Sequence, residues 1–168
     1  MQKGIKILLN RVLFLIFMLF HTHLLIAVAF FLIIRSFYPS INTPLFLVIL
    51  LFGSILPDID EPKSTINRWS GIIGRIITFF AKHRGFFHSL LFITIISSVI
   101  YYFLNPQYAL ALSLGFLAHL IGDGVTPMGI ELLYPFSSFR INGPIKVGSW
   151  AEKVIMALLV VFIVWQVL

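Results

Sequence analysis

Five apolar runs, separated by short polar stretches, constrain the fold of this chain more than any other feature. They cover residues 12–34, 45–56, 86–104, 108–121 and 154–168. Of the 168 residues, 60% are apolar and 11% are charged, whereas roughly 25% are charged in an average soluble domain. So few charged residues cannot cover the surface of a soluble protein of this size. The apolar runs therefore predict membrane-spanning helices. We expect an all-α fold: one domain, residues 1–168, forming a polytopic membrane helical bundle of about five spans.

Two segments depart from a simple span. Counted from Ile41, the second run has 16 residues, about 24 Å at 1.5 Å per residue, so its far end is expected below the membrane surface. Residues 63–82 are mixed, with Arg68, Arg75 and Lys82 set between apolar residues that recur at three- and four-residue steps. The apolar residues are Ile66, Trp69, Ile72, Ile73, Ile76, Ile77 and Phe80. This pattern predicts an amphipathic helix in the membrane interface, or equally a helix packed on the protein's own surface.

Basic residues predict the orientation of the bundle. With five spans, all but one of the 12 Lys and Arg residues lie on the side where the first, third and fifth spans begin. They are Lys3, Lys6, Arg11, Lys63, Arg68, Arg75, Lys82, Arg84, Arg140, Lys146 and Lys153, and Arg35 alone lies on the other side. The positive-inside rule makes the first side cytoplasmic, which predicts a multi-pass protein of the cytoplasmic (inner) membrane. The net charge of +6 does not indicate a nucleic-acid partner, because the basic residues are dispersed among apolar runs.

The polar segment at residues 83–89 is unusual in so apolar a chain. It places His83 and His88 around Arg84 and Gly85. Two histidines five residues apart do not share one face of a regular helix, but a glycine between them permits a bend that turns both rings toward one point. The segment is therefore a candidate for half of a metal site. The alternative is a titrating pair at the interface beside an arginine that contacts lipid phosphate.

Two further pairs carry possible metal ligands. His119 and Asp123 are four residues apart at the end of an apolar helix, so they share one face. Imidazole and carboxylate suit zinc or another divalent ion, although this pair alone more often means a hydrogen bond that closes a helix end. Asp58 and Asp60 alternate around Ile59, which in an extended segment puts both carboxylates on one side. The alternative there is a solvated acidic turn.

The case for a metal site rests on convergence. Separate elements bring His or Asp pairs to the same membrane face, where all six acidic residues lie, and ionisable groups at membrane depth are functional candidates. The chain has no cysteine, so thiolate sites are excluded. Oxygen and imidazole donors in this number fit a di- or trinuclear hydrolytic site better than one structural ion. His23 lies in the first run, and its depth is open because it depends on where that helix enters the membrane.

Several motifs stand in order along residues 22–136. They are Thr22-His23, Gly53-Ser54-Ile55-Leu56-Pro57-Asp58-Ile59-Asp60, Pro62-Lys63-Ser64, His83-Arg84-Gly85 with His88-Ser89, Gly115 through His119, Asp123, Thr126-Pro127, Gly129 and Tyr134-Pro135-Phe136. This set resembles the motifs of the YdjM-like inner-membrane metal-dependent hydrolases. The chain departs from that pattern at Glu61, where the family often has His or another residue, and at Phe87, where it usually has Thr.

The resemblance implies a helical membrane protein distantly similar to the zinc-dependent phospholipase C and nuclease superfamily, whose histidines and aspartates hold zinc ions that cleave phosphoesters. Carried over by position, the implied metal ligands are His23, Asp58, Asp60, His83, His88, His119 and Asp123. The implied cofactor is two or three Zn²⁺ ions, with Mn²⁺ or another divalent ion as the alternative.

The expected function is a membrane-bound hydrolase that cleaves a phosphoester of a phospholipid or another lipid-linked phosphate with metal-activated water. In this hypothesis Asp58 or Asp60 bridges metals or orients the water, and Arg84 pairs with the phosphate. Arg140 and Lys146 are weaker phosphate candidates. The expected partners are the lipid bilayer and the lipid substrate. The alternatives are an ion, proton or metal transporter, and a non-enzymatic membrane scaffold with a structural metal.

Overall fold

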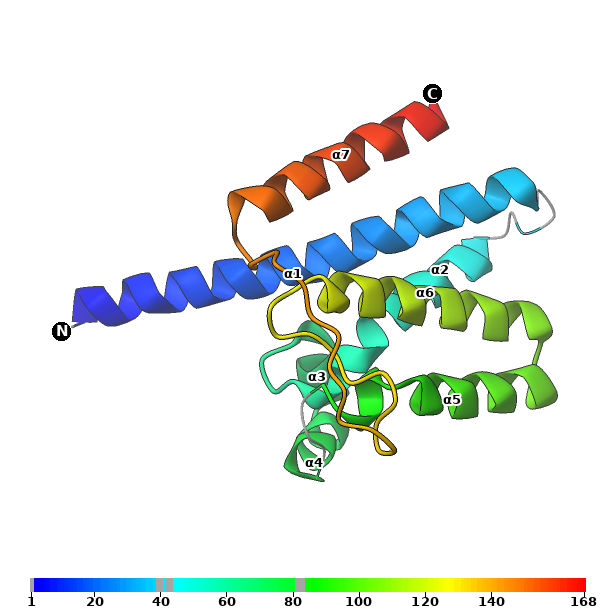
Figure 1. The fold of residues 1–168 in the computed structure, drawn as a ribbon, viewed down its shortest axis with the longest axis horizontal. Coiled ribbons are helices and arrows are strands. Elements are labelled where there is room, and N and C mark those ends of the chain that lie inside the picture. The colour runs from blue at the N-terminus through cyan, green and yellow to red at the C-terminus, as the bar shows by residue number, and fades with distance from the viewer. Residues whose placement is uncertain (1, 39–40, 42–43, 81–83) are drawn as a thin grey trace.

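Five apolar helices run side by side and form the body of the structure, a computed structural model (Figure 1). They are α1 (Gln2–Phe37), α2 (Pro44–Ile55), α5 (Leu90–Phe103), α6 (Pro106–Gly124) and α7 (Trp150–Val167). The structure describes residues 2–38, 41, 44–80 and 84–168, with side chains from residue 20 onward except that of residue 80. Within these ranges there is no β-strand, only an isolated bridge between Ile130 and Ile141 in the loop before α7. The all-α prediction is confirmed.

Polar caps mark the points where three of the apolar helices begin. The hydroxyl of Ser89 accepts a hydrogen bond from the backbone of Phe92 and starts α5. The side chain of Asn105 caps α6, with Pro106 in its first turn. The hydroxyl of Ser149 caps α7. Each cap satisfies an N–H group that has no partner inside its helix, so the polar residues between the apolar runs set the helix boundaries.

Helix α6 is the centre of the bundle and packs against α1, α2 and α5. A cluster of buried apolar side chains joins it to α1 and α2, and a second joins it to α5. The approach to α2 depends on Gly115, where a Cβ atom would lie only 1.9 Å from the carbonyl oxygen of Leu50. Small residues allow such close approach between helices in membranes. This contact fixes the register of α6, which carries part of the candidate site, against α2.

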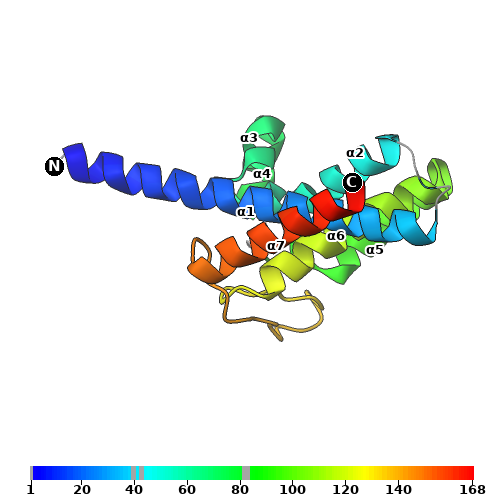
Figure 2. The ribbon, with the colours of Figure 1, turned by 90° about the horizontal axis from the view of Figure 1, so that it is seen from above.

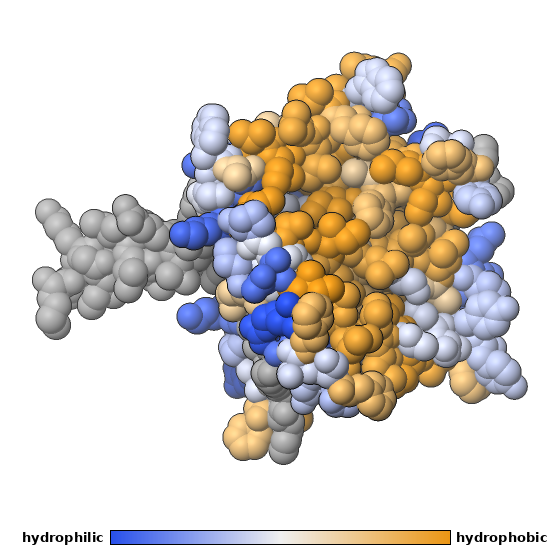
Figure 3. All heavy atoms as spheres, in the orientation of Figure 1, coloured by the Kyte–Doolittle hydropathy of each residue, from blue (hydrophilic) through white to orange (hydrophobic). Residues whose placement is uncertain are grey.

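Helix length does not establish five membrane spans. Among the described residues, two helices are long and apolar enough to cross a bilayer by themselves, over Phe20–Phe37 in α1 and over Trp150–Val167 in α7. Helix α2 has 12 residues and α5 has 14, fewer than the roughly 20 that a full span needs. The sequence predicted that the second run would be too short for a full span, and the structure shows that α5 is also too short. Apolar side chains cover the middle of the face in Figure 3, with polar ones toward its two ends.

The predicted amphipathic helix over residues 63–82 is wrong as a single element. The chain forms two short helices instead, α3 (Thr65–Ser70) and α4 (Ile72–Phe80), separated by Gly71. Gly71 has a φ of 59°, which residues with a side chain adopt rarely, so it ends α3 and turns the chain into α4. We call residues 65–80 the α3–α4 hairpin. It projects sideways from the bundle, across the direction of the apolar helices (Figure 2).

Candidate metal centre

Helix α6 supplies two buried side chains, His119 and Asp123, to one end of the bundle. The Nδ1 atom of His119 lies 2.8 Å from the backbone carbonyl oxygen of Ser54 at the end of α2. A carbonyl oxygen only accepts hydrogen bonds, so Nδ1 carries the proton and Nε2 keeps its lone pair. A histidine held in this way through one nitrogen presents the other as a ligand.

The second imidazole comes from His88, which lies in a short 3-10 helix, η3 (Phe86–His88), just before α5. Its Nε2 atom is 3.2 Å from Nε2 of His119, and its Nδ1 atom is 3.4 Å from a carboxylate oxygen of Asp60. The carboxylate favours a proton on Nδ1, which leaves the lone pair of His88 facing that of His119. Two facing lone pairs repel, and a cation held by both nitrogens removes this repulsion.

Asp58 and Asp60 lie in another 3-10 helix, η2 (Leu56–Asp60), and take different positions. The expectation that both carboxylates share one side is wrong, because residues two apart point in different directions in a helix with three residues per turn. Asp60 is buried against Nδ1 of His88. Asp58 instead turns Oδ1 toward the facing nitrogens, 3.9 Å from Nε2 of His88 and 3.7 Å from Nε2 of His119, and 25% of its side chain is exposed.

Four atoms therefore converge: Nε2 of His88, Nε2 of His119, Oδ1 of Asp58 and Oδ2 of Asp123. The Asp123 oxygen lies 3.5 Å from the His88 nitrogen and 3.7 Å from the His119 nitrogen, and it is buried without a hydrogen-bond partner among the described residues. Two ligand atoms on one tetrahedral zinc ion lie about 3.3–3.6 Å apart, given bond lengths of about 2.0–2.2 Å. The two histidine nitrogens lie 3.2 Å apart, and each carboxylate oxygen lies 3.5 to 3.9 Å from both of them, distances that fit a zinc site. We call these four residues the donor set.

His23 of α1 reaches the same cluster. Its ring stacks on that of His119 with centroids 4.0 Å apart, and its Nε2 atom lies 3.6 Å from Oδ1 of Asp123. His23, Asp58 and His119 form a second group whose ligand atoms all lie within 4.8 Å of one another. Both ring nitrogens of His23 are buried without a hydrogen-bond partner in the described chain. His23 is therefore a candidate ligand beside the donor set.

Gly122 of α6 makes this position of His23 possible. A Cβ atom at residue 122 would lie 2.6 Å from Nδ1 of His23, closer than side chains approach in folded proteins. The role of Gly122 was missed at the sequence level. The signal for it was a glycine inside a helix, directly before the candidate ligand Asp123.

Arg84 makes different contacts from those predicted. Its guanidinium is buried, donates to Oδ1 of Asp123 at 2.9 Å, and also donates to the hydroxyl of Thr126 and the carbonyl of Gly129. Arg84 has a φ of 58°, an uncommon conformation for a residue with a side chain, which fits a position held by these surrounding bonds. Arg84 therefore orients the Asp123 carboxylate through Oδ1, while Oδ2 faces the two histidines. The sequence predicted instead that this arginine would pair with phosphate.

The remaining predicted residues fall into two groups. His83 lies outside the described residues. Of the weaker phosphate candidates, Arg140 is paired with Glu131 at 2.6 Å and donates to the carbonyl of Met128, whereas Lys146 is exposed. Sequence reasoning missed a buried link between the first and last helices, in which the hydroxyl of Thr22 donates to Glu152 at 2.9 Å.

The chain matches a family of membrane proteins. The model of the family described as "YdjM inner membrane protein" matches residues 18–168. The chain is 35% identical to the "Inner membrane protein YdjM" of Escherichia coli over 121 residues, 67% of this chain and 61% of that protein, and equally to the protein of the same description from Shigella flexneri. It is 35% identical over 108 residues to the "Uncharacterized protein YvsG" of Bacillus subtilis, 62% of this chain and 67% of that protein. No solved structure matches the chain.

Proposed function

This chain belongs to the YdjM family of inner membrane proteins, and we propose that it is a membrane-bound metal-dependent hydrolase acting on a phosphoester of a phospholipid or another lipid-linked phosphate. The observation that carries the proposal is the donor set, two imidazole nitrogens 3.2 Å apart with two carboxylate oxygens that each lie within 3.9 Å of both. The chain spans 61% of the length of the Escherichia coli protein, so the activity is proposed from these residues and not transferred from a relative.

The donor set would hold one Zn²⁺ or another divalent ion, and His23 with the Asp58 carboxylate, which can bridge two metals, would contribute ligands to a second. Bound metal would lower the pKa of a water molecule and polarise a phosphoryl oxygen. The protein's own groups would prepare the site. The Ser54 carbonyl and the Asp60 carboxylate fix the two imidazoles so that each presents Nε2, and Arg84 orients the Asp123 carboxylate through a hydrogen bond to Oδ1.

The exposure of the ligands favours a catalytic metal over a structural one. His88, His119 and Asp123 are almost completely buried, whereas Asp58 reaches solvent. A structural zinc site is closed by protein ligands, but a catalytic site keeps a position for water or substrate. The three buried residues would hold a catalytic ion, and Asp58, on the open side of the site, would be the ligand that an incoming water displaces and that then orients this water.

The same geometry argues against transport. A transport pathway would continue charged groups or histidines across the bilayer, but α5 has no Asp, Glu, Lys, Arg or His, and the last helix has none after Lys153. We place the apolar helices across the inner membrane, with the donor set at the cytoplasmic face that the basic residues indicate. A lipid phosphate in that leaflet would then lie at the level of the site.

The test is metal content and cleavage for the full chain reconstituted in phospholipid vesicles. Bound divalent metal should be found by elemental analysis, and EDTA should abolish release of phosphorylated headgroups or free diacylglycerol. Asp58→Asn should lose cleavage, while Glu61→Gln, which removes the same charge three residues further on, should keep it. A protein that binds no divalent metal refutes the proposal. So does one that binds metal, unfolds on its removal and cleaves no lipid phosphoester, because that metal is structural.

A further inference from the structure

The α3–α4 hairpin presents an apolar face to its surroundings. Trp69 is 73% exposed, and Ile72, Ile73 and Ile76 are also exposed. Ile72 and Ile76 are one turn apart on α4, so their side chains form one stripe with Ile73 at its edge. Apolar side chains gathered in this way mark a contact surface with a membrane or a protein.

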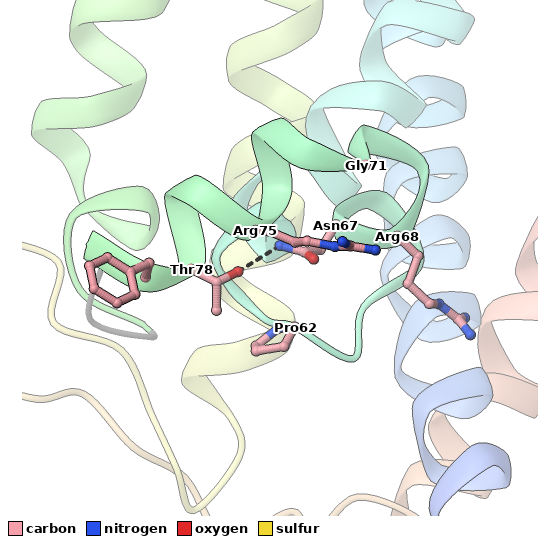
Figure 4. A pocket seen from close by; sticks show the side chains of 7 residues that line it. Pro62, Asn67, Arg68, Gly71, Arg75 and Thr78 are labelled. Atoms are coloured by element: carbon pink, nitrogen blue, oxygen red, sulfur yellow. Dashed lines mark hydrogen bonds between the residues drawn. The ribbon is translucent and has the colours of Figure 1, made fainter.

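A cationic hollow lies beside this stripe. It has a volume of about 520 Å³, and its lining includes Asn67 and Arg68 of α3 and Arg75 and Thr78 of α4. In Figure 4 the side chain of Arg75 extends from α4 toward Arg68. Among the described residues, no carboxylate lies within ion-pair distance of either guanidinium. Both arginines line the same hollow and neither has a carboxylate partner in the described chain, so an anion in the hollow would be attracted by both charges.

The hairpin is placed where lipid headgroups would be. It projects across the direction of the apolar helices, so it lies along the membrane plane if those helices cross the bilayer (Figure 2). It is also fixed to the bundle. The side-chain amide of Asn67 donates to the carbonyl of Ile59 at 2.6 Å, and the hydroxyl of Ser64 donates to the carbonyl of Asp58 at 2.6 Å. The hollow therefore keeps a fixed position relative to η2.

We propose that the α3–α4 hairpin binds the phosphate headgroup of an anionic phospholipid. Arg68 and Arg75 hold the phosphate through charge-assisted hydrogen bonds, and the Ile72–Ile76 stripe with Trp69 enters the acyl region beside it. Charge complementarity selects this occupant, because a neutral or cationic surface would leave both guanidiniums uncompensated. This site is separate from the donor set, and its occupation requires neither metal nor catalysis.

The test uses the fluorescence of Trp69 in the full chain. The protein has three tryptophans, so Trp150→Phe and Trp165→Phe leave Trp69 as the only one. The variant is reconstituted in bilayers that contain brominated phosphatidylglycerol or brominated phosphatidylcholine, since bromine quenches a tryptophan that it contacts. Both lipids should quench Trp69, and the anionic lipid should do so at a mole fraction roughly thirtyfold lower, as expected for two basic residues that each contribute about 1 kcal/mol at a membrane surface.

The double variant Arg68→Gln, Arg75→Gln should lose the preference for the anionic lipid and keep quenching by the neutral one. Arg35→Gln, which removes an exposed arginine at the other end of α1, should keep the preference. Absence of quenching by either lipid overturns the proposal, as does equal quenching by both in the starting variant, or a preference that survives loss of both arginines. Loss of the preference on addition of millimolar inorganic phosphate assigns the hollow to a soluble anion and also overturns it. None of these readouts depends on hydrolysis, so the proposed activity and this site can fail separately.

Discussion

Gly115 is the residue through which helix packing controls the candidate metal centre. In Gly115→Ala the new Cβ atom would lie 1.9 Å from the carbonyl oxygen of Leu50, about 1.5 Å closer than the 3.4 Å at which ordinary contact begins. Backbone atoms on both sides cannot rotate away, so α6 must move from α2 by about that amount. Such overpacking costs roughly 1–3 kcal/mol of folding free energy.

The displacement has a specific consequence one turn further along both helices. There the 2.8 Å hydrogen bond from Nδ1 of His119 to the Ser54 carbonyl would lengthen beyond hydrogen-bonding distance. His119 would lose the contact that fixes its ring, and loss of such a contact lowers metal affinity about 10–100-fold. The measurement is zinc affinity by competition with a chromophoric chelator, together with thermal unfolding of the detergent-solubilised protein.

Gly124→Ala provides the matched control, because it makes the same chemical change in the same helix. Its Cβ atom would meet only a side-chain carbon of Ile130 at 3.6 Å, an ordinary contact. This variant should bind zinc as the unmodified protein does and unfold at the same or a slightly higher temperature. If Gly115→Ala binds zinc with unchanged affinity while it is measurably destabilised, the α2–α6 contact does not position His119, and that reasoning is refuted.

Three further predictions concern the same centre. Gly122→Ala should push the ring of His23 aside, since the new methyl group would lie 2.6 Å from its Nδ1 atom; elemental analysis should then show fewer metal ions per chain, with at least one retained, and an unchanged count would contradict a ligand role for His23. Asp60→Asn should weaken zinc binding about 10–100-fold by removing the carboxylate that faces Nδ1 of His88, and equal affinity in the competition assay would show that Asp60 does not orient that ring. Removing metal with EDTA should lower the unfolding temperature by several degrees, because free metal at 100 times its dissociation constant contributes about 2.7 kcal/mol; identical melting curves would mean that no metal is bound.

Much of the architecture could be predicted from the sequence, because hydrophobic runs and polar caps are local signals. Each of the five predicted runs overlaps one of the apolar helices α1, α2, α5, α6 and α7. The number of membrane spans could not be settled in this way, because α2 and α5 are too short to cross a bilayer by themselves. The break at Gly71 was missed because the apolar pattern continues across it, whereas the backbone turns there.

The candidate site was predicted in composition but not in detail, for a physical reason. Residue type and membrane side are sequence properties, so five of the predicted ligands, His23, Asp58, His88, His119 and Asp123, could be selected and do converge. The direction of a side chain depends on tertiary partners. Arg84 turns inward because Asp123, Thr126 and Gly129, about 40 residues away in the chain, surround its guanidinium, and no local pattern contains that information.

The two proposals meet at η2, the short helix that carries Asp58. On one side of η2 lies the open edge of the donor set, where Asp58 is the ligand that reaches solvent. On the other side lies the hairpin, held through the carbonyls of Asp58 and Ile59. If the hairpin rests on lipid headgroups, the open edge of the centre is held at the same depth in the membrane interface. A phosphoester of a membrane lipid would then meet the centre without leaving the bilayer, whereas a soluble phosphoester would gain nothing from the hairpin. Removal of Arg68 and Arg75 should therefore reduce cleavage of a lipid phosphoester and leave cleavage of a small soluble one unchanged, and an equal loss for both substrates would separate the hairpin from substrate access.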